Sequence, residues 1–479
     1  MRAVDLLETY KNLENNVLDE TLVNKVIRAA LARGGDFAEL FVEEKSTFSA
    51  SIDDGLIEDL ASGTARGAGI RVRVGETTGF AHTADLSETS LMRAVEAASS
   101  LARTSNRRVA QVGLNPRTFV AIDNDKATPG SIAKDRKIDL LKRLDAAGRG
   151  AGAAIRQVSA GYSDSLRRFL VANSEGVFVE EEQIRTRIAV SCVAIGDTGM
   201  QTGYETAAMT MGFELFDDID LENLAVSAAN RAILKLSARP TPSGQLPVVL
   251  NGLGGGVLFH EACGHGLEAD HILKDSSVYT GRLGDLVASP LVTLLDDGTV
   301  HNQWGTYTHD DEGNVAGKNV LIENGILVDY MWDQTQGDRK SRASSGNGRR
   351  QSYAHLPMVR MTNTYLMPGA QTPQEIISDT ERGIYVAKLG GGQVNTATGD
   401  FVFGMTEAYL IEDGQITFPL RDANLIGNGP EVLANIDAVA NDFAIVPGTC
   451  GKDGQSVPVG CGQPTLRITR VTVGGTASA

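Results

Sequence analysis

The stretch VANSEGVFVEEEQIRTRIAVSCVAIG, residues 171–196, alternates apolar and polar side chains on both sides of a turn signal at Ser174-Glu175-Gly176. Alternation with a period of two is typical of a strand with one buried face, and a turn between two such runs predicts a β-hairpin. Residues 155–195 show the same pattern, and further strand signals occur at residues 46–55 and 68–83. The first half of the chain is therefore predicted to contain an antiparallel sheet.

Segments with helical periodicity flank these strands. In residues 19–35 the apolar side chains between Leu22 and Leu31 recur on one helix face, and the pattern ends at Gly34-Gly35. Similar segments occupy residues 86–103, 137–150 and 222–236. The combination predicts an N-terminal α/β domain in which helices flank the antiparallel sheet.

A break in both periodicities separates the two halves of the chain. Residues 238–247 contain three prolines and a glycine, which interrupt helices and strands alike. We therefore predict an N-terminal domain over residues 1–240 and a C-terminal domain over residues 241–479. Beyond the break, short apolar runs are separated by DDG, ENG and EDG turns, which favour hairpins. The fold class is predicted as α+β, with a β-rich C-terminal domain that carries one important helix.

Composition excludes several classes of protein. A chain of 479 residues with 42% apolar residues can form two well-packed domains, and its net charge of −16 argues against nucleic-acid binding. No apolar run approaches the ~20 residues of a membrane-spanning helix, and residues 1–20 lack the apolar core of a signal peptide. Four scattered cysteines do not suggest a disulfide framework. We expect a soluble cytoplasmic protein.

The segment FHEACGHGLEAD, residues 259–270, resembles a zinc-protease helix with an unusual spacing. Its pattern is HExxxH, so His260 and His265 are five residues apart instead of four. Five residues of a regular α-helix turn about 140°, which would place the two imidazoles on nearly opposite faces. A single π-type turn would bring them back to one face, and Gly264 is the residue most able to accept a distorted backbone. The spacing therefore predicts a widened turn over residues 262–265.

Two histidines with a glutamate after the first favour a metal site over ordinary core histidines. Glu261 points away from its neighbour on a helix, so it is expected to act as a general base instead of a ligand. Glu268 and Asp270 could orient a ligand imidazole through its free N–H.

The spacing of the motif does not identify the residue that would be the third metal ligand. A turn rich in proline and glycine around Cys450 could present its thiol at an exposed point, and a metal or the adjacent Lys452 would favour the thiolate. Packing is the better interpretation of the remaining cysteines. The candidates for the third ligand are a carboxylate, a cysteine, or one of His271, His301, His309 and His355; the cysteines interpreted as packing are Cys192, Cys263 and Cys461.

A basic segment over residues 337–350 has two interpretations. It could be a solvated, mobile loop, which is the more common case for such a charge cluster. Alternatively, Arg349 and Arg350 could bind a substrate carboxylate, and Tyr353 and His355 could donate hydrogen bonds to an oxyanion. The other cations of this segment are Arg339, Lys340 and Arg342.

Several segments together resemble the TldD/PmbA family of metallopeptidases, and specifically its TldD-type catalytic members. They include SIDDGLIEDL, HEACGHGLEAD, GRRQSYAHLPMVRMTNTY, TGDFVFGMTEAYLIEDG and GTCGKDGQSVPVGCGQPTLRI, and the resemblance covers nearly the whole chain. It implies that one zinc ion per chain is bound by His260, His265 and Cys450, with Glu261 as the catalytic glutamate.

The resemblance also implies a partner and a substrate class. Paralogous PmbA-type (TldE) subunits lack the HExxxH motif, and a heterodimer with such a subunit would enclose the zinc site in a chamber. A chamber would admit unfolded or extended peptides, in line with the family's association with peptide maturation and antitoxin degradation. Two alternatives from other classes are a cysteine hydrolase with Cys450 as the nucleophile, and a non-catalytic peptide-binding subunit.

Overall fold

The computed structural model describes residues 17–32, 34–100, 113–121, 127–197 and 199–475. The prediction about a signal peptide concerns residues 1–20, most of which lie outside this part of the chain, as does the end of the helix expected over residues 86–103. Among the described residues, no helix combines the length and apolar character needed to cross a membrane.

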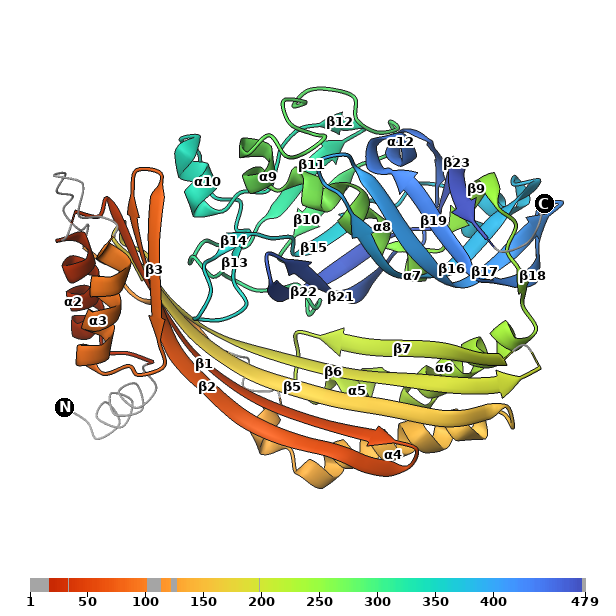
Figure 1. Ribbon diagram of the computed structural model, residues 1–479, viewed down its shortest axis with the longest axis horizontal. Coiled ribbons are helices and arrows are strands. Elements are labelled where there is room, and N and C mark those ends of the chain that lie inside the picture. The colour runs from red at the N-terminus through yellow and green to blue at the C-terminus, as the bar shows by residue number, and fades with distance from the viewer. Residues whose placement is uncertain (1–16, 33, 101–112, 122–126, 198, 476–479) are drawn as a thin grey trace.

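The first sheet has seven strands in the order β3-β2-β1-β5-β6-β4, with β7 beside β6. Its long strands curve beneath the C-terminal half of the chain (Figure 1). All neighbouring pairs are antiparallel except β4 with β6, and the predicted hairpin is present as β5 and β6. The strands are β1 (Phe37–Asp53), β2 (Leu56–Val74), β3 (Thr77–Thr83), β4 (Thr118–Val120), β5 (Ile155–Asn173), β6 (Phe178–Gly196) and β7 (Gly199–Met209).

Helices bury the outer face of this sheet in two groups. At one end, α2 (Glu20–Leu31) and α3 (Glu88–Ala98) form an apolar core with β1 and β2. Farther along, α4 (Lys134–Gly150) and α6 (Leu221–Leu236) form a second core with β5 and β6, and α5 (Leu215–Asp218) is a short turn that precedes α6 in the chain. The predicted arrangement of an antiparallel sheet with flanking helices is confirmed.

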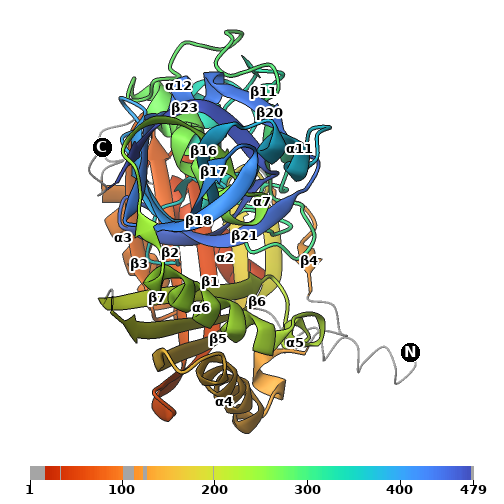
Figure 2. The same ribbon diagram turned by 90° about the vertical axis from the view of Figure 1, so that its right-hand side faces the viewer.

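Two further sheets build the C-terminal half. A six-stranded sheet runs β12-β11-β10-β15-β22-β21, so β21 lies at its edge. In an eight-stranded sheet, β16 pairs with both β9 and β17, which closes β16, β9, β23, β19 and β17 into a ring (Figure 2). The strands are β8 (Arg239–Pro240), β9 (Gly244–Leu250), β10 (Leu294–Asp297), β11 (Lys318–Glu323), β12 (Ile326–Leu327), β13 (Gly348–Arg349), β14 (Met358–Val359), β15 (Asn363–Leu366), β16 (Arg382–Val394), β17 (Asp400–Glu412), β18 (Gln415–Arg421), β19 (Ala423–Asn428), β20 (Ile436–Val439), β21 (Ala444–Lys452), β22 (Gln455–Gln463) and β23 (Leu466–Gly474).

Short helices complete this half: α7 (Gly252–Gly255), α8 (Val257–Phe259), α9 (Ala269–Leu273), α10 (Gln334–Arg339), α11 (Pro373–Ser378) and α12 (Gly429–Ala434). The α+β class and the β-rich C-terminal half are as predicted. Residues 238–247 do not form a free connection, because β8 pairs with β18 and the start of β9 pairs with β23. The division into residues 1–240 and 241–479 stays a prediction.

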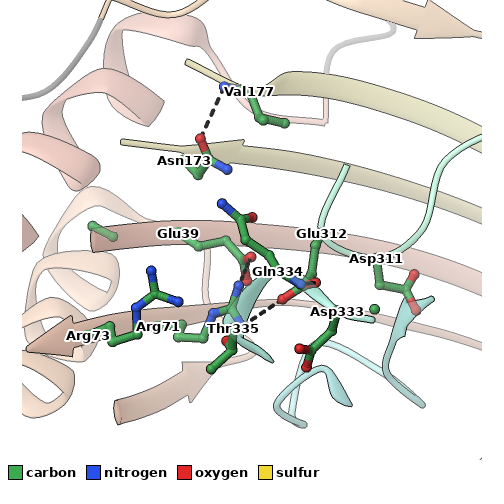
Figure 3. A network of polar contacts seen from close by, with 12 residues as sticks. Glu39, Arg71, Arg73, Asn173, Val177, Asp311, Glu312, Asp333, Gln334 and Thr335 are labelled. Atoms are coloured by element: carbon green, nitrogen blue, oxygen red, sulfur yellow. Dashed lines mark hydrogen bonds and ion pairs between the residues drawn. The ribbon is translucent and has the colours of Figure 1, made fainter. Parts of the chain in front are cut away.

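A buried network of charges joins the first sheet to the C-terminal half (Figure 3). The Arg71 guanidinium on β2 contacts Glu39 Oε2 at 2.5 Å and Glu312 Oε1 at 2.8 Å. Arg350 Nη2 reaches the other oxygen of Glu39 at 2.6 Å. Burial and the neighbouring Glu312 raise the pKa of Asp333 to about 8, so this carboxyl is protonated at neutral pH. Two guanidinium groups are thus balanced by two carboxylates, which is the condition under which charges can be buried.

Candidate metal centre

The HExxxH motif follows directly from the ring of the C-terminal half. Strand β9 ends at Leu250, Asn251 caps the helical segment by accepting a hydrogen bond from the Leu253 N–H, and α7 and α8 lead into the motif. Residues His260–Gly264 form a π-helical turn in which the N–H of His265 donates to the carbonyl of His260, five residues back. The predicted widened turn is confirmed.

Gly264 serves this turn for a reason that differs from the predicted one. Its φ of −52° and ψ of −53° are ordinary helical values, so the turn does not depend on the conformational freedom of glycine. A Cβ atom at this position would lie 2.2 Å from the sulfur of Met361. Glycine at this position therefore allows the turn to pack closely against Met361.

The π turn places both imidazoles on one side, where a third side chain joins them. The ring centroids of His260 and His265 are 4.9 Å apart, and Cys450 Sγ lies 3.4 Å from His265 Nε2. The three side chains can offer ligand atoms that all lie within 4.8 Å of one another. Within the described part of the chain, Cys450 is the only candidate for a third ligand that joins this group.

Strand β21 holds Cys450 in a buried position. The side chain is 2% exposed and pairs in register with Val457 of β22, so the predicted presentation at an exposed turn is wrong. Burial alone would raise the pKa of this thiol, but the imidazoles of His260 and His265 lower it to about 4. The side chain is thus a thiolate at neutral pH, which is the form that binds metal ions.

Glu268 fixes the orientation of one imidazole, as predicted. Its Oε2 lies 3.1 Å from His265 Nδ1, which leaves Nε2 directed at Cys450. Lys452 Nζ donates to Glu268 at 2.9 Å and to Asp270 at 2.7 Å. Although burial would raise the pKa of Glu268, Lys452 and His265 hold it well below its usual range. Lys452 therefore stabilises the carboxylate that orients His265, and Asp270 contacts Lys452 instead of an imidazole.

Glu261 lies beside the three side chains without belonging to their group. It is half-buried, and burial raises the pKa of its carboxyl although the two imidazoles act in the opposite direction. A carboxyl with a raised pKa is suited to accepting and returning a proton. This position agrees with the role of a general base and not with that of a ligand.

Sequence reasoning missed one neighbour of the centre. The Cys461 thiol on β22 contacts His260, so this cysteine is not simple packing. The sequence around Cys461 does not predict this contact, because the contact depends on the position that β22 takes in its sheet. Cys192 and Cys263 are buried in apolar surroundings that raise the pKa of each thiol, as expected for packing residues.

A second group of possible ligands, formed by Glu268, Asp270 and His271, lies next to the first. The Lys452 ammonium already contacts the two carboxylates of this group. The ammonium group of Lys452 thus occupies the place that a metal ion would take beside these carboxylates. We interpret the group as one that holds His265 in position.

The basic segment is only partly the solvated loop considered above. Lys340 is exposed, but Arg349 and Arg350 are 4% and 2% exposed. The Arg349 guanidinium donates to the carbonyls of Met361 and Pro458. Arg339 and Arg342 pair with Glu76 and Asp329 respectively.

Tyr353 and His355 follow this segment. The Tyr353 ring packs against Gly67 of β2 and the cluster around Phe41, and His355 Nδ1 lies 2.9 Å from the Ser352 hydroxyl. Among the described residues, no hydrogen bond joins either side chain to the two histidines or the cysteine of the candidate centre. Their role as oxyanion donors stays a prediction.

Sequence models of three PmbA/TldA metallopeptidase domains match the chain: domain 1 over residues 38–102, the central domain over residues 127–236 and the C-terminal domain over residues 243–475. The chain belongs to the TldD/PmbA family of metallopeptidases. The metalloprotease TldD homolog of Haemophilus influenzae is 39% identical over 473 residues, which are 96% of this chain and 97% of that protein. This agrees with the TldD-type resemblance, and the chain is a metallopeptidase.

Other members of the TldD/PmbA family are similar at greater distance. The zinc metalloprotease TldD homolog of Saccharolobus solfataricus is 30% identical and covers 71% of this chain and 76% of its own length. The crystal structure of TldE from Thermococcus kodakarensis has a TM-score of 0.77 at 20% identity and covers 95% of this chain and 100% of that chain. The latter similarity shows the shared fold.

Proposed function

We propose that this chain is a zinc-dependent peptidase whose metal is held by His260, His265 and Cys450. The observation that carries the proposal is the meeting of these three side chains, two from the π turn and one from a strand distant in sequence. The pattern of three protein ligands is that of catalytic zinc sites, which keep one position open.

The donor set fits zinc. The Cys450 thiol has a pKa near 4 and is available as a thiolate, and Glu268 directs His265 Nε2 into the group. His260 Nδ1 is buried without a hydrogen-bond partner in the described part of the chain. Two imidazoles and a thiolate match the nitrogen and sulfur ligands that zinc prefers.

Bound zinc would supply Lewis-acid polarisation of the scissile carbonyl and of the attacking water. In this proposal Glu261 takes a proton from that water and passes it to the leaving amine. Its half-buried position raises the pKa of the carboxyl, which helps it to hold the proton between these two events.

Substrates are proposed to be unfolded or extended peptides. A cavity of about 860 Å³ lies between β7, α6, β16 and β21, and it is lined by Cys461, which contacts His260. Strand β21 borders the cavity and lies at the edge of its sheet. An edge strand can bind an extended peptide through main-chain hydrogen bonds, which depend little on the peptide's side chains.

The proposal includes a partner. A PmbA-type (TldE) subunit would form a heterodimer with this chain and enclose the zinc site in a chamber, and roles in peptide maturation and antitoxin degradation would follow. The common fold of this chain and the TldE structure is what supports such a pairing. Co-purification of the two subunits and comparison of peptidase activity with and without the partner test it.

Metal content is the first test of the site. The purified chain should bind about one zinc ion, and Cys450→Ser should bind less or none because a hydroxyl is a much poorer zinc ligand than a thiolate. Elemental analysis of both proteins after dialysis measures the ratio. Cys192→Ser, which changes a buried cysteine far from the histidines, is the matched control and should keep its zinc. Equal zinc content in all three proteins would contradict the ligand role of Cys450.

The short distance between Cys450 Sγ and His265 Nε2, 3.4 Å, also suits a cysteine hydrolase. That alternative predicts that thiol reagents inactivate the protein and chelators do not. Inactivation by a chelator with recovery on addition of zinc would exclude it. A non-catalytic peptide-binding subunit would instead bind peptides and show no turnover with or without its partner.

Glu268→Gln is expected to lower the affinity for zinc about 10–100-fold, because the orienting carboxylate of a ligand histidine is lost. The measurement is competition with a chromophoric chelator. Glu323→Gln removes an exposed carboxylate on β11 and should leave the zinc affinity unchanged. If Glu268→Gln binds zinc as tightly as wild type, the carboxylate does not position His265.

A further inference from the structure

A second cavity lies between the curved sheet and the tip of the β21–β22 hairpin. Its volume is about 340 Å³, and its walls come from β1, β5 and β6 on one side and from β13 and the hairpin on the other. No residue of the candidate metal centre lines it. Five cationic side chains do so: Lys45, Arg167, Arg185, Arg349 and Arg350.

Three of these cations have no carboxylate partner among the residues that the structure describes. Arg185 donates to the carbonyls of Trp304 and Thr306 and to the Gln183 side chain, and Arg349 donates only to carbonyls. Lys45 has no ion pair with any described residue, although Glu43 and Asp311 lie near enough to act on it. Neutral oxygens hold the two guanidinium groups in place but do not cancel their charge.

The other two cations have carboxylate partners. Arg167 is 9% exposed and pairs with Glu43 and Asp311, yet its Nη2 has no hydrogen-bond partner among the described residues. Arg350 pairs with Glu39, and its Nη1 is likewise without a partner. Both of these nitrogens are inaccessible to solvent, so the two arginines contribute positive charge around the cavity and not free donors.

The carboxylates of the cavity wall do not balance this charge. Asp164 contacts Lys137 at 2.5 Å, outside the cavity. Burial and the nearby Glu312 raise the pKa of Asp310 well above its usual range, and its oxygens accept hydrogen bonds from the backbone N–H groups of Glu312, Asn314 and Gly348. The third carboxylate that lines the cavity, Asp311, already pairs with Arg167. Glu43 and Glu39, which do not line the cavity, pair with Arg167 and Arg350.

The mutual repulsion of the cations is visible at Arg185. Burial and the facing guanidinium groups of Arg349 and Arg167 lower its pKa to about 9. An anion placed among these groups would remove that repulsion and would gain charge-assisted hydrogen bonds.

The position of the cavity connects it with a peptide path. Thr449 lines this cavity, whereas Ile445, Val446, Pro447 and Gly448 line the cavity of about 860 Å³ described above. The two cavities thus follow one another along the edge strand β21, which also carries Cys450. An extended peptide along β21 would therefore bring one of its groups to the cations.

We propose that the cavity lined by Lys45, Arg185 and Arg349 binds a carboxylate of the peptide substrate. This deepens the proposed function, on which it rests, by assigning anionic peptides as the preferred substrates. The carboxylate could be that of the C-terminus or of an acidic side chain, since both present the same two oxygens to a guanidinium.

The test is peptide binding to the full-length chain in a Glu261→Gln background, so that no peptide is cleaved. Two pairs of short peptides are compared by calorimetry: a free C-terminal acid against its amide, and an internal Glu against Gln. The carboxylate form of at least one pair should bind about tenfold more tightly or better. Arg185→Gln and Lys45→Gln should each reduce this preference strongly, and Arg185→Lys should keep most of it.

Arg156→Gln is the control, because it removes an exposed charge from β5 that does not line the cavity. It should keep the preference in full. The pair that shows the preference identifies the source of the carboxylate. No preference in either pair, or a preference that survives both Arg185→Gln and Lys45→Gln, would overturn the proposal, as would binding of inorganic phosphate alone.

The outcome is separable from that of the proposed function. Binding is measured without turnover, so a carboxylate preference would stand even if the chain hydrolysed no peptide. Conversely, a zinc-dependent peptidase without this preference would leave the peptidase proposal intact and remove only the anion site.

Discussion

Replacing Glu261 with Gln should lower peptide hydrolysis by about 10²–10⁴-fold, the usual contribution of a general base. The amide has the shape of the carboxylate but cannot take a proton from water. Glu261 is outside the group formed by His260, His265 and Cys450, so the zinc content of the variant should equal that of wild type. The measurement is the rate of cleavage of an extended peptide by the complex with the partner subunit, together with elemental analysis.

A comparison with Glu268→Gln separates the two carboxylates of the motif. Glu268 acts on His265, so its loss should be compensated by a higher zinc concentration, because only metal affinity is weakened. Glu261→Gln should stay inactive at any zinc concentration. Undiminished turnover of Glu261→Gln would remove this residue from the mechanism, and recovery at high zinc would assign it to metal binding.

The local geometry of the motif was predictable because it follows from helical arithmetic. Two histidines five residues apart can share a ligand only if the helix widens, and the π turn over His260–Gly264 is that widening. The alternation in residues 171–196 and the helical stripe ending near Gly34 are equally local patterns. These patterns predicted strand β6 and helix α2, together with the face of each element that is buried.

Features that depend on distant parts of the chain were not predictable in this way. The turn-like sequence around Cys450 suggested exposure, but pairing with β22 buries it. Lys452 contacts Glu268 and not the thiolate. Glu268 lies at Nδ1 of His265, whereas Cys450 Sγ lies at Nε2, the other nitrogen of the same ring. The resemblance to the family supplied the prediction that Cys450 is a ligand, and spacing alone could not have selected it.

The basic segment shows the same limit. A cluster of arginines and serines is usually solvated, but Arg350 is buried. It pairs with the carboxylate of Glu39 on β1, more than 300 residues earlier in the chain. No periodicity within residues 337–350 records that partner. The structure thus divides the segment into exposed residues such as Lys340 and buried ones that either join the two halves or line the cationic cavity.

Replacing Glu39 with Gln should destabilise the protein by about 3–5 kcal/mol, the cost of removing one partner from a buried ion pair. Glu39 balances the guanidinium groups of Arg71 and Arg350, and all three side chains are almost fully buried. In the variant, two guanidinium groups face one remaining carboxylate, that of Glu312. The measurement is the shift of the denaturation midpoint in urea, followed by signals from both halves of the chain, since a chain of this size need not unfold in one step.

Glu44→Gln is the matched control. Glu44 lies on the same strand, but its pair with Arg66 spans 3.5 Å and both side chains are largely solvated, at 39% and 51% exposed. Exposed pairs contribute at most about 1 kcal/mol, so this variant should resemble wild type. Because Glu39 holds β1 and β2 against the segment that carries Arg349, its loss should also weaken the carboxylate preference of the cationic cavity. Equal stabilities of Glu39→Gln and Glu44→Gln would mean that the network is not what joins the two halves.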